Sequence, residues 1–168
     1  MYPLNRLKEV HPDLHARYSK KYVGREWMNK LVIPPLNCLW NDVLHFSLTH
    51  PAMIYGILSG LGFEHHKAPR EWFEVPLEDI KVDSSILYRN EEYDKDKEVR
   101  DSFGSDFEPV NPARVMELSV MPERNLNYYK SCLEKKIPPL LWGYAPHLLY
   151  KGKLEVGAYR TLDWKNNT

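Results

Sequence analysis

The pattern of polar and apolar positions near residue 45 predicts a strand that runs directly into a helix. A strand is predicted at 43–48, because over residues 44–49 apolar side chains alternate with polar ones and the two kinds occupy opposite faces. The polar face carries His45, Ser47 and Thr49. Pro51 favours the first turn of a helix, where its missing N–H costs nothing. Because a polar strand face that ends at a helix N-terminus often binds a ligand, we expect a site here.

Similar patterns predict the other elements. Pro12 and Asp13 favour a helix that runs to about residue 22, and apolar positions three and four apart predict a second helix over 125–135. Alternation predicts strands at several further places. These strands are 71–75, 85–88, 114–121, 147–151 and 154–159, with the last two paired around Lys151-Gly152-Lys153.

These elements together indicate an α+β fold with a single mixed, mainly antiparallel sheet and flanking helices. A length of 168 residues indicates one globular domain over 1–168. Residues 89–108 interrupt the pattern because they are highly charged and poor in aliphatic side chains. We expect a charged loop or lid there, although Val99, Phe103 and Phe107 recur every four residues and also permit a short helix.

Charge and composition narrow the classes of function. The 23 basic and 23 acidic side chains balance, so no strong signature for duplex nucleic acid is present. No apolar run is long enough to cross a bilayer, and the first residues do not have the pattern of a secretory signal. We therefore expect a cytoplasmic protein without a membrane partner. Cys38 and Cys132 lie far apart and are expected to be free thiols.

Aromatic residues are abundant, with 11 Tyr and 5 Trp, which suits a ligand pocket or a protein interface. Two proline-stiffened segments share one spacing: Trp40 precedes His45 as Trp142 precedes His147. We expect both segments to line one cleft, with His147 facing His45 across the sheet and Tyr150 following it.

The candidate catalytic groups lie on predicted strands. His45 can act as a general base beside Ser47, and the alternative is a buried histidine with a structural role. Glu117 and Glu155 can stabilise positive charge or act as bases, and the alternative is a solvated strand face. Thr49 is expected to cap the following helix, with His50 at its start.

Other chemistries lack their usual motifs. His11 and His15 have zinc-compatible spacing, but no HExxH motif is present. We therefore predict no metal site, and a metal-dependent enzyme is the weakest of the alternative functions. Neither glycine-rich phosphate-binding motif occurs.

The segment VLHFSLTH, followed by a helix and the strand EWFEVP, resembles ADP-ribosyltransferase-like domains. The resemblance implies a split sheet around a cleft for NAD. It places His45 or Ser47 by the nicotinamide ribose, Tyr55 in a stacking position, and Glu155 or Glu117 as the catalytic acid.

The leading hypothesis is therefore a small cytoplasmic enzyme that binds a nucleotide or NAD-like ligand in a His/Ser/Glu cleft. The alternative is a non-catalytic module whose aromatic-rich face binds a protein partner. A cleft requires the candidate side chains to converge on one cavity, whereas an interaction module requires a continuous exposed aromatic patch.

Overall fold

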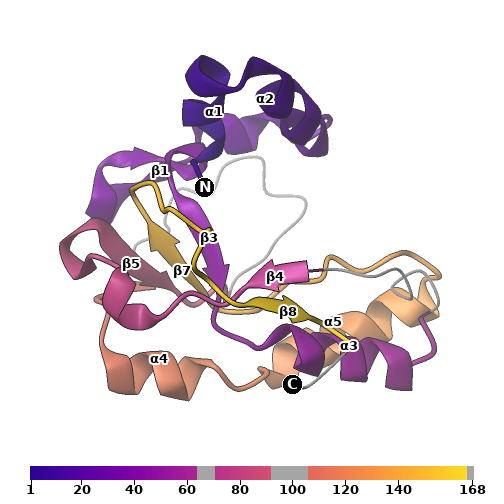
Figure 1. Cartoon of the computed structure of the whole chain (residues 1–168). Helices are drawn as coiled ribbons and strands as arrows, with labels where there is room; N and C mark the ends of the chain where they lie inside the picture. The colour runs from indigo at the N-terminus through magenta and orange to yellow at the C-terminus, as the bar shows by residue number, and fades with distance from the viewer. Residues whose placement is uncertain (64–70, 92–105, 166–168) are drawn as a thin grey trace.

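The computed structural model describes residues 1–63, 71–91 and 106–165 (Figure 1). The helices are α1 (Leu4–Val10), α2 (Pro12–Ser19), α3 (Pro51–Gly60), α4 (Pro112–Leu118) and α5 (Glu123–Glu134). The strands are β1 (Val32–Ile33), β2 (Cys38–Leu39), β3 (Leu44–Ser47), β4 (Glu71–Phe73), β5 (Ser85–Tyr88), β6 (Phe107–Glu108), β7 (His147–Tyr150) and β8 (Thr161–Asp163). The α+β class is confirmed.

The central sheet has four antiparallel strands in the order β3-β7-β5-β6. Ser47 pairs with His147 and Leu44 pairs with Tyr150, which places β3 at the edge of the sheet. The expectation of a single sheet was wrong. Strand β4 pairs with β8, and β1 pairs with β2, in two further two-stranded sheets, because their hydrogen bonds go to each other and not to the central strands.

Both faces of the central sheet are packed. One face presents Leu87, Leu148 and Tyr150 to a core that also contains Ile80 and Leu154. The opposite face carries Ile86, Tyr88 and Leu149 and packs against Ile33 and Val43. This division follows from the alternation of side chains along each strand. It leaves the polar positions of β3 on the second face.

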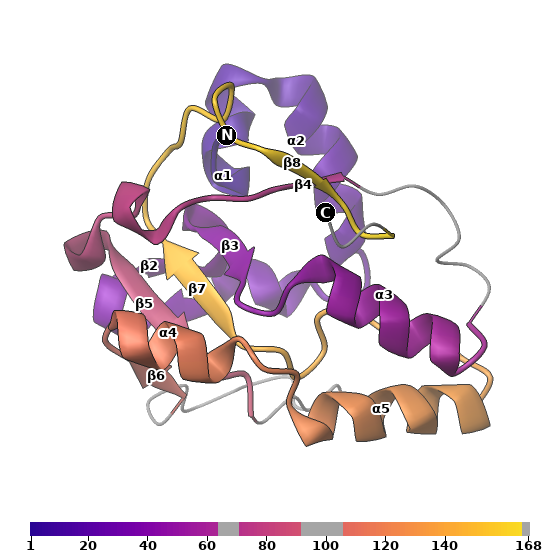
Figure 2. The ribbon, with the colours of Figure 1, turned by 60° about the horizontal axis from the view of Figure 1, so that its bottom comes forward.

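A third core joins α3 to α5. The two helices lie side by side in both orientations of the molecule (Figures 1 and 2). Ile54 and Leu58 of α3 are fully buried against Tyr129 and Cys132 of α5. Apolar side chains four apart in α3 and three apart in α5 explain the contact, because these spacings share one helix face. Both predicted helices are confirmed.

The strand predicted over 114–121 is wrong, because α4 occupies this segment. The Asn111 side chain accepts a hydrogen bond from the Ala113 N–H and Pro112 occupies the first turn, so a helix begins here. Val115 and Leu118, three apart, pack on the sheet core, while Met116 is 73% exposed. The sequence of this segment is therefore equally compatible with an amphipathic helix that buries Val115 and Leu118.

The strand predicted over 154–159 is also wrong. Strand β7 is already paired on both sides, with β3 and with β5, so no edge is left for a hairpin partner. After Gly152 the chain instead exchanges backbone hydrogen bonds between Leu154 and Met1 and continues to β8. The predicted strand at 147–151 is confirmed as β7.

Most of the expected loop or lid at 89–108 lies outside the described residues. Its two ends belong to the central sheet. The Arg89 N–H donates to the Asp106 carbonyl at 2.9 Å, and β6 pairs with β5. The predicted strands at 71–75 and 85–88 are confirmed in β4 and β5, although β4 ends at Phe73.

Candidate functional site

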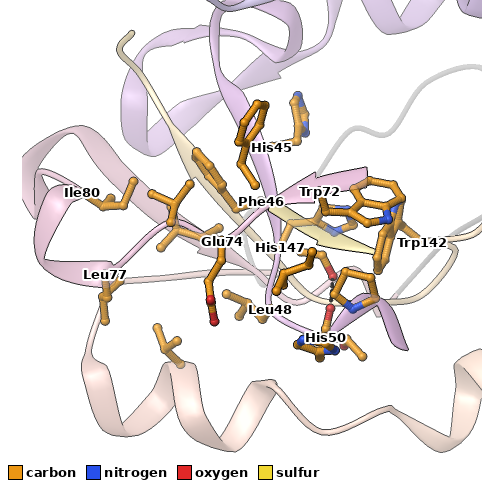
Figure 3. A pocket seen from close by; sticks show the side chains of 18 of the residues that line it. His45, Phe46, Leu48, His50, Trp72, Glu74, Leu77, Ile80, Trp142 and His147 are labelled. Atoms are coloured by element: carbon orange, nitrogen blue, oxygen red, sulfur yellow. Dashed lines mark hydrogen bonds between the residues drawn. The ribbon is translucent and has the colours of Figure 1, made fainter. Parts of the chain in front are cut away.

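A cavity of about 520 Å³ lies where β3 leads into α3 and faces β4 (Figure 3). Because β3 is an edge strand, residues from both of its faces reach this cavity. We call it the histidine cavity. The polar and aromatic residues used below are His45, Ser47, Thr49, His50, Trp72, Trp142 and His147.

His45 is held by the segment that precedes its strand. Its Nε2 atom lies 3.0 Å from the Trp40 carbonyl oxygen, and the two rings are in contact with centroids 4.6 Å apart. A carbonyl oxygen only accepts, so the hydrogen of His45 resides on Nε2 and donates to it. The other ring nitrogen, Nδ1, is therefore an acceptor. Trp40 itself is absent from the cavity lining and acts as a support for His45.

The structure brings His45 and His147 together as expected. Their ring centroids are 6.5 Å apart and the rings are nearly perpendicular. Burial lowers the pKa of His147 to about 4. The pKa of His45 is lowered by partial removal from water and, to a smaller extent, by His147. The His45 side chain remains partly exposed to water, so we expect its pKa to fall less than it would in a fully enclosed histidine. Both imidazoles are therefore neutral at pH 7.

Three buried polar atoms without a hydrogen-bond partner belong to residues that line this cavity. They are Thr49 Oγ1, Trp72 Nε1 and His147 Nδ1. Thr49 is only 1% exposed. An unpartnered buried polar atom costs roughly 1–3 kcal/mol, so three around one cavity mark it as unusual. A planar polar group in the cavity can recover part of this cost with only small side-chain movements.

Aromatic rings form one end of the cavity. Trp72 and Trp142 meet edge to face with centroids 5.1 Å apart, close to His147 (Figure 3). The opposite end is apolar, with Leu77 and Ile80. An edge-to-face pair leaves ring surface available for a further aromatic group.

The charges around the cavity are acidic. Among the described residues its lining contains Glu71 and Glu74 but no lysine or arginine side chain. The amino group of Met1, which also lines the cavity, donates to the Leu154 carbonyl. Glu74 points away from the two tryptophans in Figure 3 and lies 3.9 Å from the Arg160 guanidinium. Such a lining favours a neutral or cationic group over an anion.

Other predicted site residues lie elsewhere. Tyr55 packs on Trp164 with centroids 5.3 Å apart, and Tyr150 is buried in the core on the opposite face of the sheet. Glu117 is 64% exposed on α4 and pairs with Arg114 at 2.8 Å. Glu155 is 84% exposed, lies outside any strand and is 3.4 Å from Lys153. The structure therefore does not bring either glutamate to the histidine cavity.

The expected cap at Thr49 is also corrected. His50 is the N-cap of α3, since its Nδ1 atom accepts from the Ala52 N–H at 3.2 Å. The backbone carbonyl of Thr49 instead accepts from the Ser47 hydroxyl at 2.8 Å. The cap of α3 is therefore one residue later than predicted, and the Thr49 hydroxyl takes no part in it.

Sequence reasoning missed Trp72 as a site residue. The strand pattern of EWFEV correctly sets Trp72 and Phe73 on opposite faces, which is the one signal that was available. Residues from both faces of β4 line the cavity, and the position of β4 beside it depends on the pairing of Trp72 with Leu162 in β8, a contact across ninety residues. No local pattern encodes that contact.

Comparison of the chain with family models, with curated proteins and with solved structures found no match. Over the described residues no helix is both long and apolar enough to span a membrane. Within the same residues no group of three or more His, Cys, Asp and Glu side chains is arranged to hold a metal ion.

Proposed function

We propose that this protein binds a nucleotide of the NAD type and holds the nicotinamide ring in the histidine cavity. The observation that carries the proposal is the meeting of two tryptophans, neutral histidines and unpartnered polar atoms around one cavity, whose lining in the described residues has no lysine or arginine. The ADP-ribosyltransferase-like resemblance of VLHFSLTH independently suggests the same ligand.

The cavity volume of about 520 Å³ lies within the usual range for small-molecule sites. It is ample for a single heteroaromatic ring with its sugar. Trp72 and Trp142 would provide the ring contacts, and an aromatic surface also favours a ring that carries positive charge, as the oxidised nicotinamide ring does. A neutral His147 adds no repulsion to such a ring.

The polar atoms suit the carboxamide group of nicotinamide. Trp72 Nε1 can only donate, so it pairs with the carbonyl oxygen of the amide. The hydroxyl of Thr49 and Nδ1 of His147 can accept from the amide nitrogen. Because Trp72 Nε1 and the Thr49 hydroxyl have no partner among the described residues, binding would gain hydrogen bonds at these two atoms without breaking existing ones.

The proposal is restricted to binding. ADP-ribosyl transfer, which the resemblance implies, would use Glu117 or Glu155, and both side chains are exposed in ion pairs outside the cavity. His45 and Ser47 do line it, and the Ser47 hydroxyl is already donated to the Thr49 carbonyl. Ser47 therefore serves here to position the turn before α3.

The described residues do not form the continuous exposed aromatic patch that a protein-interaction module would need. In the described part of the chain the large hydrophobic side chains that are exposed include two aromatic ones, Tyr18 and Phe73, which lie on α2 and β4. A partner-binding aromatic face would gather more such rings in one patch. The cavity is the better supported candidate.

Calorimetric titration of the purified protein with nicotinamide mononucleotide and with nicotinic acid mononucleotide tests the proposal. We expect tighter binding of the amide, because the carboxylate of the acid would meet an acidic lining. Trp142→Ala should weaken binding of the amide ligand by at least about tenfold. Trp27→Ala is the matched control, since Trp27 is half-buried outside the lining. Absence of binding, or equal effects of the two variants, would overturn the proposal.

A further inference from the structure

A second cavity, of about 560 Å³, lies between the N-terminal helices and β3. We call it the lysine cavity, after Lys21. Met1 and His45 line both cavities, so the two spaces meet at these residues. The helices that form the outer wall are anchored beside β3 by the Asn5 amide, which donates to the Asp42 carboxylate at 2.7 Å.

The lysine cavity differs from the histidine cavity in charge. Its lining in the described residues includes Lys21 and His11 and no aspartate or glutamate. The Lys21 ammonium lies 4.9 Å from the centre of the Tyr22 ring. The hydroxyl-bearing side chains of Tyr2 and Tyr18 also line the cavity and provide hydrogen-bond donors.

Positive charge at this place is not neutralised by the protein. The Arg25 guanidinium donates to the backbone carbonyl of Lys21 at 2.6 Å, which brings a second cation beside the first. Neither side chain makes an ion pair with a carboxylate within the described ranges. Glu26, the nearest acid in sequence, instead accepts from the Gly24 N–H at 2.9 Å. Two adjacent unpaired cations make an attractive position for an anion.

The titration of Lys21 is consistent with this picture. Partial removal of the ammonium from water and the neighbouring Arg25 both lower its pKa, although much of the Lys21 side chain is exposed, and no carboxylate is among the influences on this pKa. Lys21 is also the smallest of the influences that shift the pKa of His45, a residue that lines both cavities.

We propose that the lysine cavity binds the phosphate groups of the same nucleotide, with Lys21 as the phosphate-binding side chain and His45 between the two ends of the ligand. This inference rests on the proposed function. The arrangement assigns a neutral or cationic ring to the acidic cavity and an anion to the basic one. It makes a phosphorylated nucleotide, and not a free nucleoside, the ligand class.

The test compares nicotinamide riboside, which has no phosphate, with nicotinamide mononucleotide. We expect the wild-type protein to bind the mononucleotide more tightly. Lys21→Gln should weaken mononucleotide binding by about tenfold and leave riboside binding unchanged. Lys21→Arg should retain most of the preference. Lys20→Gln is the matched control, because Lys20 is exposed, adjacent in sequence and outside both linings.

The outcomes separate this inference from the proposed function. If wild-type protein binds both ligands equally, or Lys21→Gln weakens both equally, the phosphate role is wrong while ring binding stands. A third outcome is that inorganic phosphate binds in a Lys21-dependent manner while the riboside does not bind. The ring assignment then fails and the lysine cavity is a site for free anions. That result also overturns the nucleotide inference. A lower salt dependence of mononucleotide binding in Lys21→Gln would support the proposal directly.

Discussion

His45 and His147 come from strands that are separated by a hundred residues, yet their rings lie 6.5 Å apart and nearly perpendicular across neighbouring strands. The diagonal arrangement follows from the pairing of Ser47 with His147, which sets His45 two residues further along the same face. This relationship links the edge strand to the centre of the sheet and places both imidazoles at one cavity.

Lowering the pH should destabilise the fold through His147. Its pKa in the folded protein is about 4, below the ordinary value near 6.5, so the unfolded chain binds more protons between these values. Stability is therefore complete above about pH 6.5 and falls as the pH decreases towards 4. From pH 7.5 to 5 this group alone should remove about 2 kcal/mol from the free energy of unfolding.

Urea unfolding at the two pH values measures this effect, with His147→Gln as the comparison, because glutamine does not titrate. The variant should lose less stability on acidification than the wild-type protein. An identical pH dependence of the two proteins would show that His147 titrates normally.

Thr49→Val should separate binding from folding. The Thr49 hydroxyl is buried without a partner, so its replacement by a methyl group should leave the free energy of unfolding unchanged or raise it by up to ~1 kcal/mol. Ligand binding should weaken, because the variant cannot bond the carboxamide. Denaturant unfolding and calorimetry measure the two quantities. Thr161→Val, at an exposed strand position, is the control, and a large loss of stability in Thr49→Val alone would contradict the role given to Thr49.

Glu117→Gln and Glu155→Gln should bind the mononucleotide like the wild-type protein. Both side chains are largely exposed in surface ion pairs, which contribute little to stability, and neither lines the histidine cavity. We expect changes of less than about 0.5 kcal/mol in the free energy of unfolding. A tenfold loss of affinity in either variant would restore the catalytic role that the resemblance implies.

Gly152→Ala should destabilise the turn after β7. A Cβ atom at this position would lie 2.5 Å from Cζ of Tyr150, whose ring is 5% exposed and has little room to move. Such overpacking costs about 1–3 kcal/mol, measurable by chemical unfolding. In the background Tyr150→Leu the same substitution should cost less, because the smaller side chain leaves space. Equal costs in the two backgrounds would show that the ring is not the obstacle.

Side-chain alternation and proline positions predicted the elements that hold the site. The strand around His45, the helix that begins at Pro51, and strand β7 with His147 all form as expected. The repeated Trp-to-His spacing also led us to expect His45, His147 and Trp142 at one cleft, and all three line the histidine cavity, whereas Trp40 does not.

The same kind of pattern failed over residues 114–121, where alternation predicted a strand and α4 formed. Asn111 and Pro112 favour a helix start, and Val115 and Leu118 lie on one helix face. The same residues also alternate as they would in a strand, so the local pattern is compatible with both structures. Only the available partners decide between them. The segment pairs with no strand of the central sheet, and Val115 and Leu118 instead pack on the apolar core of that sheet.

The sequence by itself determined the conformation around His45, Pro51 and His147 and the sidedness of the strands there, because helix capping and the alternation of side chains depend on neighbours in the chain. The tertiary structure alone decided which strands pair, that Trp72 reaches the cavity, and that Glu117 and Glu155 do not. These outcomes depend on contacts between residues distant in the sequence, such as Trp72 with Leu162, whose energies no local pattern contains.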